Sequence, residues 1–135
     1  MNVLSVVHKA AEIHTTIADE SLDVLCICET FSQPATPDTV IADIEPPNYS
    51  VICASRSDGR RAGLAVIYRD RYRVNRVALT FAPKGFEVQT IALNVESERF
   101  IVVNIYRPPN YTNVDSFLDG LADVFDAVVD FDTTS

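Results

Sequence analysis

The stretch Leu22–Phe31, LDVLCICETF, decides how the rest of the chain is interpreted. Between Asp23 and Glu29 lie consecutive apolar residues, a run that is typical of a short strand covered on both faces. The run delivers one carboxylate, Glu29, to the carboxyl end of the strand, where α/β proteins commonly place their chemistry. Taken alone, Glu29 has two interpretations: a solvated carboxylate at a strand end, which is the commoner case, or a functional acid.

Local patterns on both sides of this stretch predict the remaining elements. Apolar residues at helical spacing predict a helix over 7–20, and a second helix begins near residue 115, with Asp115 or Ser116 as its N-cap and aspartates on its solvated face. Runs of strand-forming residues predict strands over 2–6, 22–31, 49–54, 63–69, 72–81, 86–95 and 100–106. This order predicts an α+β fold with a largely antiparallel sheet and helices packed on one face.

Length and composition limit the class of protein. The 135 residues make one domain, or part of a larger one. No apolar run approaches the ~20 residues that cross a bilayer, and no signal-peptide pattern is visible at the N-terminus. We therefore expect an intracellular protein, nuclear or cytoplasmic, with no membrane partner. The odd number of cysteines, three, predicts reduced thiols rather than a disulfide framework.

Charge is unevenly distributed although the net charge is −8. Residues 56–76 contain seven arginines and two aspartates, whereas residues 115–132 contain six aspartates and no basic residue. A polyanion such as DNA would therefore meet the protein at the arginine segment. The alternative, that these arginines only form the solvated polar faces of a hairpin, stays open at this point.

Four pieces of the sequence together resemble one family. They are the start Asn2-Val3-Leu4-Ser5, the stretch from Leu22 to Glu29-Thr30-Phe31, the strand at 63–68 and the run Asn104-Ile105-Tyr106-Arg107-Pro108-Pro109. In this order and spacing they resemble the N-terminal half of the endonuclease/exonuclease/phosphatase superfamily, in the form carried by non-LTR retrotransposons. The resemblance covers nearly the whole chain, and it implies half of a four-layer α/β sandwich, truncated before its second half.

The resemblance also implies roles for single residues. Glu29 matches the glutamate that binds the catalytic Mg²⁺, or Mn²⁺ in its place, and Asn2 matches an asparagine close to that metal. Tyr106 matches a tyrosine whose hydroxyl donates to the scissile phosphate. DNA is then the implied partner, and we assign Arg56, Arg60, Arg61 and Arg107 as contacts to its phosphodiester backbone. Asn104 shares a strand face with Tyr106, but the resemblance gives it no role.

Two motifs of the family are absent from residues 1–135. Relatives continue into a strand that ends in Gly-Asp-Phe-Asn and later into Ser-Asp-His, which supply the groups that position the attacking water. The segment 130–132, Asp-Phe-Asp, is no substitute because it follows a helical pattern. We therefore expect a truncated phosphodiesterase or DNA endonuclease domain that is not catalytically competent alone.

Three alternatives stay open. The chain is a degenerate, non-catalytic copy that acts as a nucleic-acid-binding or interaction module, a phosphatase of the same superfamily, or a product without function. The oligomeric state does not follow from the sequence.

Overall fold

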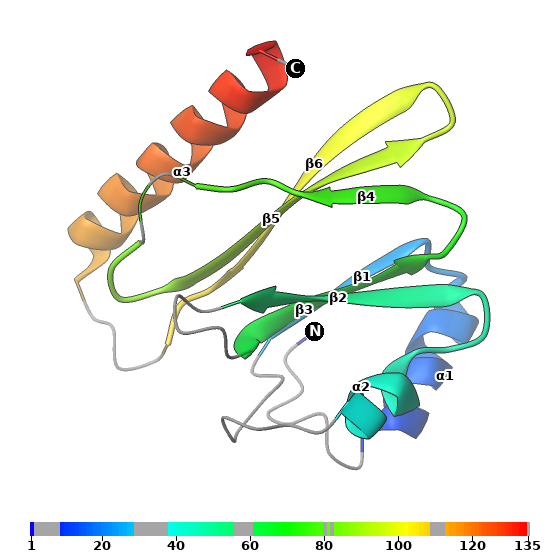
Figure 1. Ribbon diagram of the computed structural model, residues 1–135. Coiled ribbons are helices and arrows are strands. Elements are labelled where there is room, and N and C mark those ends of the chain that lie inside the picture. Colours follow the sequence, from blue (N-terminus) through cyan, green and yellow to red (C-terminus); the bar gives the residue numbers. More distant parts are fainter. Residues whose placement is uncertain are drawn as a thin grey trace. The chain divides into compact units, whose positions relative to one another are not determined.

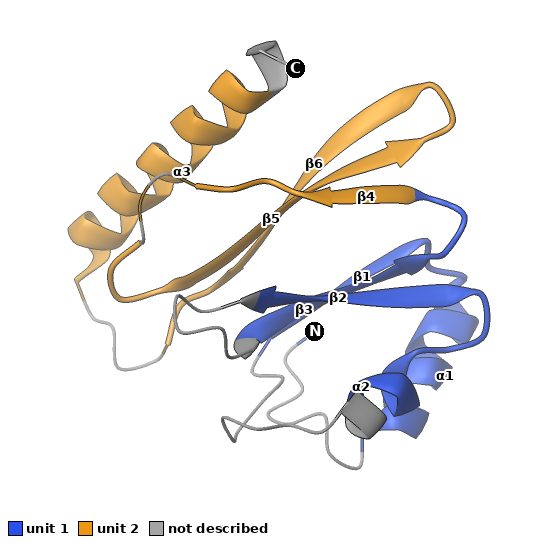
Figure 2. Ribbon diagram, viewed as in Figure 1, with its two compact units in different colours: residues 1–72 blue, residues 73–135 orange. Residues whose placement is uncertain are grey.

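The computed structural model describes residues 1, 9–28, 38–55, 61–79, 81, 83–108 and 113–134, and the chain divides into two compact units. Unit 1 spans Met1–Tyr72 and unit 2 spans Arg73–Ser135 (Figure 2). Each unit is described by itself.

Unit 1 contains a three-stranded antiparallel sheet and two helices (Figure 1). Its elements in chain order are α1 (Ala10–Glu20), β1 (Val24–Cys28), α2 (Asp38–Ile44), β2 (Tyr49–Ser55) and β3 (Arg61–Arg69). The strand order is β1-β3-β2, so β3 pairs with both neighbours along its length. This central position explains the continuous burial of β3 from Gly63 to Ile67.

The end of α1 follows from its sequence. Ser21 adopts the left-handed conformation (φ 50°), and its N–H donates to the carbonyl of Ala18 while the N–H of Leu22 donates to that of Ile17. This pair of bonds satisfies carbonyls at the helix end, as in a Schellman motif, with serine in the place of the usual glycine. The predicted end of this helix at residue 20 is confirmed, and the chain continues from there into β1.

The core of unit 1 lies between the helices and one face of the sheet. Its members share nearly complete burial and aliphatic side chains: Ile13, Ile17, Ile27, Ile44, Ala65 and Ile67. Ile27 stands next to Ala65 through the β1–β3 register, which places both side chains on the face that α1 covers. Burial of such side chains stabilises a fold by ~1.5–3 kcal/mol each.

Unit 2 contains a second antiparallel sheet and one long helix. Its elements are β4 (Arg73–Arg76), β5 (Glu87–Val95), β6 (Glu98–Tyr106) and α3 (Val114–Thr134), and the strand order is β4-β5-β6. Val124 and Val128 of α3 pack with Phe86 above the β5–β6 hairpin, against side chains such as Val88 and Val103. The Phe86 ring also meets the edge of Phe117, with centroids 5.1 Å apart and planes at 80°.

The predicted α+β class with antiparallel strands is confirmed, with the strands distributed over two sheets of three. The strand expected over 72–81 is shorter, because its register with β5 ends at Arg76. Just beyond it the Val77 N–H donates to the Thr90 carbonyl, and the Val77 carbonyl accepts a hydrogen bond from the Thr90 hydroxyl instead of a backbone N–H. The strand expected over 2–6 falls outside the described residues.

Two local predictions need correction. The helix α2 was not expected, and α3 begins one residue earlier than predicted because Asn113, not Asp115 or Ser116, is its N-cap. The Asn113 Oδ1 atom accepts a hydrogen bond of 3.0 Å from the Ser116 N–H. Phe131 lies inside α3, which confirms that segment 130–132 is helical and cannot supply the missing strand-end motif.

The helices and the cysteines bear on two further predictions. Within the described part of the chain, no helix is both long and apolar enough to cross a bilayer. Cys26, Cys28 and Cys53 form no disulfide, and each is half-buried.

Candidate functional site

The carboxyl end of β1 is held by the first residue of the chain. The Cys28 N–H donates to the Met1 carbonyl over 2.9 Å, and the Met1 ammonium donates to the Cys26 carbonyl over 2.7 Å. This pair of bonds brackets Ile27 and has the pattern of a parallel bridge. Met1 immediately precedes Asn2, and Cys28 immediately precedes Glu29. The neighbours of both predicted site residues are therefore joined by hydrogen bonds.

Most of the residues predicted for the site in unit 1 lie outside the described residues. These are Asn2, Glu29, Arg56 and Arg60, and only the backbone of Arg61 is described. The structure thus describes the ends of the strands next to these residues in the chain. The roles assigned to their side chains stay predictions.

The pairing of β3 divides the predicted arginine segment. Leu64 pairs with Cys28, and Arg61 lies further along β3 toward the same end of the sheet. Arg69, at the other end of β3, donates to the Asp23 carboxylate before the start of β1. Arg61 and Arg69 are eight residue steps apart along β3, which corresponds to ~26 Å. The described arginines of β3 therefore do not form one patch, and of these two only Arg61 lies near the carboxyl end of β1.

Arg69 and Asp23 form a structural ion pair. The Arg69 guanidinium donates to Asp23, which holds the pKa of that carboxyl below its usual value, and the pKa of Arg69 rises in return. Arg69 also lies 5.2 Å from the centroid of the Tyr49 ring. A cleft of about 380 Å³ adjoins these residues and is lined largely by apolar groups such as Ile17 and Pro46. Because this cleft adjoins Arg69, it lies at the end of the sheet away from Cys28.

Tyr106 and Arg107 form the described part of the site in unit 2. Tyr106 is the last residue of β6, is half-buried and lies opposite Glu87 across the hairpin. Arg107 follows it, is exposed, and lies 5.3 Å from the centroid of the Phe117 ring. The ring contact orients the guanidinium without neutralising its charge, so Arg107 keeps its ability to pair with an anion.

Buried amides flank Tyr106 on the same face of the hairpin. Asn104 pairs with Gln89 in the strand register, and the Asn104 Nδ2 atom donates to Gln89 Oε1 over 3.3 Å. Both side chains are buried, at 7% and 5% exposure. Asn104 was predicted on the Tyr106 face, whereas Gln89 and Glu87 were not predicted near the site. The two-residue turn at Glu96–Ser97 could have identified both, since its length fixes the register of the hairpin.

The fit of a metal ion to the predicted site depends on the ligand atoms that its residues offer. Among the described residues, no three His, Cys, Asp or Glu side chains gather as metal ligands would. The predicted metal ligand, the carboxylate of Glu29, offers hard oxygen atoms, and Asn2 is predicted close to the metal. Such a small set fits Mg²⁺, which retains water and phosphate ligands and needs one or two carboxylates.

Comparisons with known proteins give one informative likeness. No family model and no curated protein matches the chain. Among solved structures, the chain is similar to the endonuclease domain of TRAS1, a telomere-specific non-LTR retrotransposon, with a TM-score of 0.58 and 16% sequence identity. The match covers 92% of this chain and 51% of that chain. The chain therefore spans about half the length of that structure, and the predicted resemblance to a retrotransposon endonuclease is confirmed at the level of the fold.

Proposed function

We propose that this chain contributes half of the active site of a metal-dependent DNA endonuclease. The observation that carries the proposal is the shared fold with the TRAS1 endonuclease domain over 92% of the chain. Two further observations support it. The residues preceding Asn2 and Glu29 are joined at the end of β1, and Tyr106 and Arg107 stand together at the end of β6.

Each residue has a defined task in this proposal. Glu29 would hold Mg²⁺, and the Asn2 amide orients that carboxylate or the phosphate. Tyr106 donates its hydroxyl proton in a hydrogen bond to the phosphate as negative charge develops there. Arg61 and Arg107 pair with phosphates of the DNA backbone. When bound, Mg²⁺ supplies positive charge to the phosphate and a more acidic water.

The residues present position the phosphate but do not include a general base. The loss of general-base catalysis alone costs ~10²–10⁴ in rate. Residues 1–135 therefore bind DNA in a metal-dependent way without cutting it at a useful rate.

The experiment measures binding of a fluorescent DNA duplex to the chain by anisotropy, with and without Mg²⁺, and nicking of supercoiled plasmid in parallel. We expect Mg²⁺ to tighten binding, Glu29→Gln to remove that effect, and no nicking. Glu45→Gln is the matched control, because Glu45 is an exposed carboxylate in the loop after α2. For the hydroxyl, Tyr106→Phe is compared with Tyr68→Phe, since Tyr68 is a half-buried tyrosine close to the far end of β3.

The outcomes separate the candidate functions. Nicking that depends on Mg²⁺ and disappears in Glu29→Gln would contradict the predicted inactivity of the chain. DNA binding that falls steeply with salt but ignores Mg²⁺ and Glu29→Gln would favour the non-catalytic nucleic-acid-binding module instead. Metal-dependent hydrolysis of a phosphate monoester would favour the phosphatase.

A further inference from the structure

One flank of α3, between its buried side and its acidic side, carries an apolar stripe that the rest of unit 2 leaves exposed. Val114, Leu118, Phe125 and Val129 are between 48% and 59% exposed. At ~100° per residue these four positions fall within ~60° of one another, so they form one continuous line along the helix. Val124 and Val128, which pack against Phe86, point to a different side. Single exposed apolar residues are ordinary, but an aligned set of this kind marks an interaction surface.

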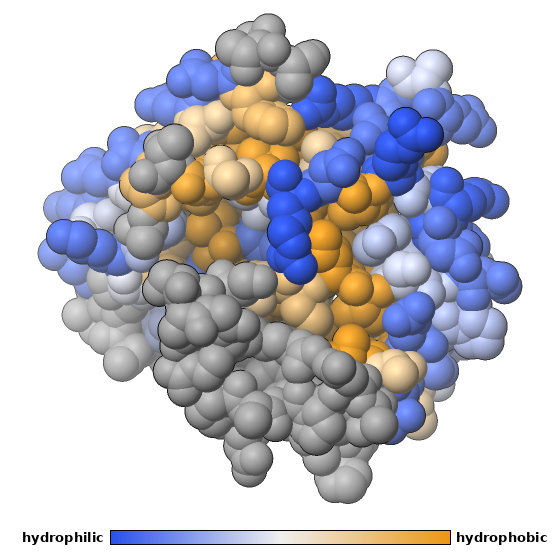
Figure 3. Space-filling model, in the orientation of Figure 1, coloured by the Kyte–Doolittle hydropathy of each residue, from blue (hydrophilic) through white to orange (hydrophobic). Residues whose placement is uncertain are grey.

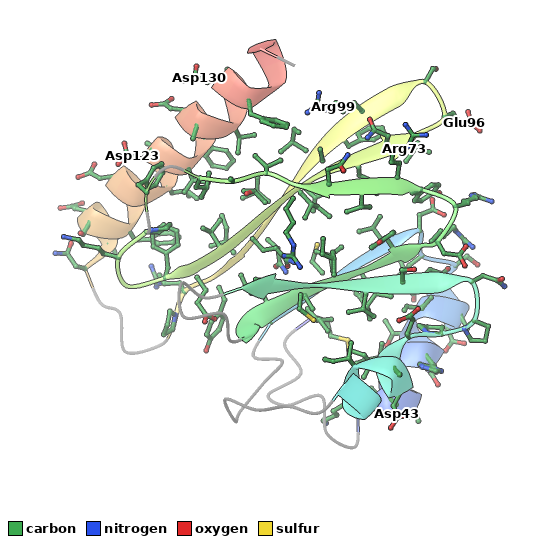
Figure 4. All side chains as sticks on the ribbon, in the orientation of Figure 1. Asp43, Arg73, Glu96, Arg99, Asp123 and Asp130 are labelled. Carbon is green, nitrogen blue, oxygen red and sulfur yellow. The ribbon has the colours of Figure 1, made fainter. Side chains whose placement is uncertain are left out.

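An acidic ridge runs beside this stripe. It consists of exposed aspartates, namely Asp115, Asp119, Asp123, Asp126 and Asp130. Figure 4 shows Asp123 and Asp130 on the side of α3 that faces away from β5 and β6. In Figure 3 the atoms at the outer border of α3 are hydrophilic, and hydrophobic atoms lie inside that border. No basic residue lies in the last turn of α3 itself. The Arg99 guanidinium of β6 lies at this end of the helix, 4.7 Å from the centroid of the Phe131 ring.

The charges decide which occupant fits the stripe. A second copy of α3 would bring its own aspartates against this ridge, and like charges at an interface are repulsive. Nucleic acid and anionic membranes are disfavoured for the same reason. A positively charged partner gains both burial of its apolar side chains and attraction to the ridge.

We propose that the exposed apolar stripe of α3 docks a basic amphipathic helix of a partner protein. The partner's apolar residues cover Leu118, Phe125 and Val129, and its lysines or arginines flank them beside Asp115 and Asp126. From Val114 to Val129 the stripe is ~22 Å long at 1.5 Å per residue, so a partner helix of about four turns covers it. This surface lies on α3 and is argued independently of the proposed endonuclease site.

The test uses synthetic helical peptides of that length as probes. Two peptides share one stripe of leucines, and their flanking positions carry lysine in one and glutamate in the other. Anisotropy of the labelled peptides with the whole chain should show binding of the lysine peptide only. Leu118→Gln combined with Phe125→Gln should weaken this binding by ten-fold or more, which corresponds to at least ~1.4 kcal/mol. Asp115→Asn combined with Asp126→Asn should weaken it in a salt-dependent way.

Phe100→Gln provides the matched control. Phe100 is 46% exposed in β6 of the same unit, while its neighbour Ile101 packs toward α3, so Phe100 lies on the opposite face of the hairpin. Phe100→Gln should leave peptide binding unchanged. All substituted positions are exposed, and circular dichroism should show that the variants keep the helix content of the parent chain.

Four results would overturn the proposal. They are equal binding of both peptides, an equal loss of binding in Phe100→Gln, a dimer in light scattering that Leu118→Gln with Phe125→Gln dissociates, and stripe-dependent binding to vesicles of phosphatidylcholine and phosphatidylserine. The third result would assign the stripe to a second copy, and the fourth would assign it to a membrane surface.

Discussion

Gly120→Ala should fail to stabilise the protein, although alanine is the better helix former. Gly120 lies in the middle of α3, and a Cβ atom there would stand 2.8 Å from Cε1 and 3.3 Å from Cζ of Phe86. The Phe86 ring is 6% exposed and rests on the edge of Phe117, so it cannot move aside without losing contacts. Glycine at position 120 therefore has a lower helix propensity than alanine, but it leaves room for the Phe86 ring.

Two opposing contributions to the free energy of unfolding decide whether Gly120→Ala stabilises the protein. The helix gains ~1 kcal/mol from glycine to alanine, whereas an added methyl in a packed core costs ~1–3 kcal/mol. We expect Gly120→Ala to lower the free energy of unfolding by ~0–2 kcal/mol. In a Phe86→Leu background the clash is gone, and the same substitution should raise the free energy of unfolding by ~1 kcal/mol.

Urea unfolding, followed by far-ultraviolet circular dichroism, measures all four members of this double-mutant cycle. Ala122→Gly calibrates the contribution of helix propensity, because Ala122 is an exposed residue of the same helix. This substitution should lower the free energy of unfolding by ~1 kcal/mol. Equal stabilisation by Gly120→Ala in both backgrounds would refute the reasoning, since it would mean that Phe86 does not occupy the space above Gly120.

Three further predictions concern unit 1. The pKa of Asp23 is lowered mainly by its hydrogen bond from Arg69, so the ion pair stabilises the fold above about pH 4 and this contribution is lost as the pH falls through the lowered pKa. The stability difference between the parent chain and Asp23→Asn, measured by urea unfolding, should therefore shrink at acidic pH, and a constant difference would contradict this. Burial raises the pKa of the Cys26 thiol, so iodoacetamide should alkylate Cys26 more slowly than a cysteine in a short peptide, as followed by mass spectrometry. Ile13→Ala should cost ~2–5 kcal/mol in urea unfolding, because Ile13 is fully buried between α1 and the sheet, and a loss below that range would place Ile13 at the edge of the core.

Elements with a strong local pattern could be predicted from the sequence. Three such patterns each lie within one segment, and the structure has all three elements. They are the helical apolar spacing of α1, the uninterrupted apolar run of β1 and the helical apolar stripe of α3. The helix α2 was missed because its seven residues are too few to show a clear period. The N-cap of α3 was misplaced by two or three residues, since Asn113, Asp115 and Ser116 are all residue types that cap helices and only the hydrogen bond distinguishes them.

The candidate site was predictable in part for the same reason. Tyr106 stands at the end of β6, where the break at Arg107-Pro108 indicated, and Glu29 follows β1 directly in the chain. Gln89 and Glu87 were missed because only the β5–β6 register shows that they lie opposite Asn104 and Tyr106.

The sequence by itself determined most of the helices and strands, which strands lead to a predicted site residue, and where opposite charges concentrate. These properties are local, since they depend on side chains a few residues apart. The tertiary structure alone decided that Arg61 and Arg69 lie at opposite ends of β3, that Asn104 bonds to Gln89, and that one stripe of α3 remains exposed while another is buried. The physical reason is that strand register and packing join groups distant in the chain, and local spacing does not encode which partner each of them meets.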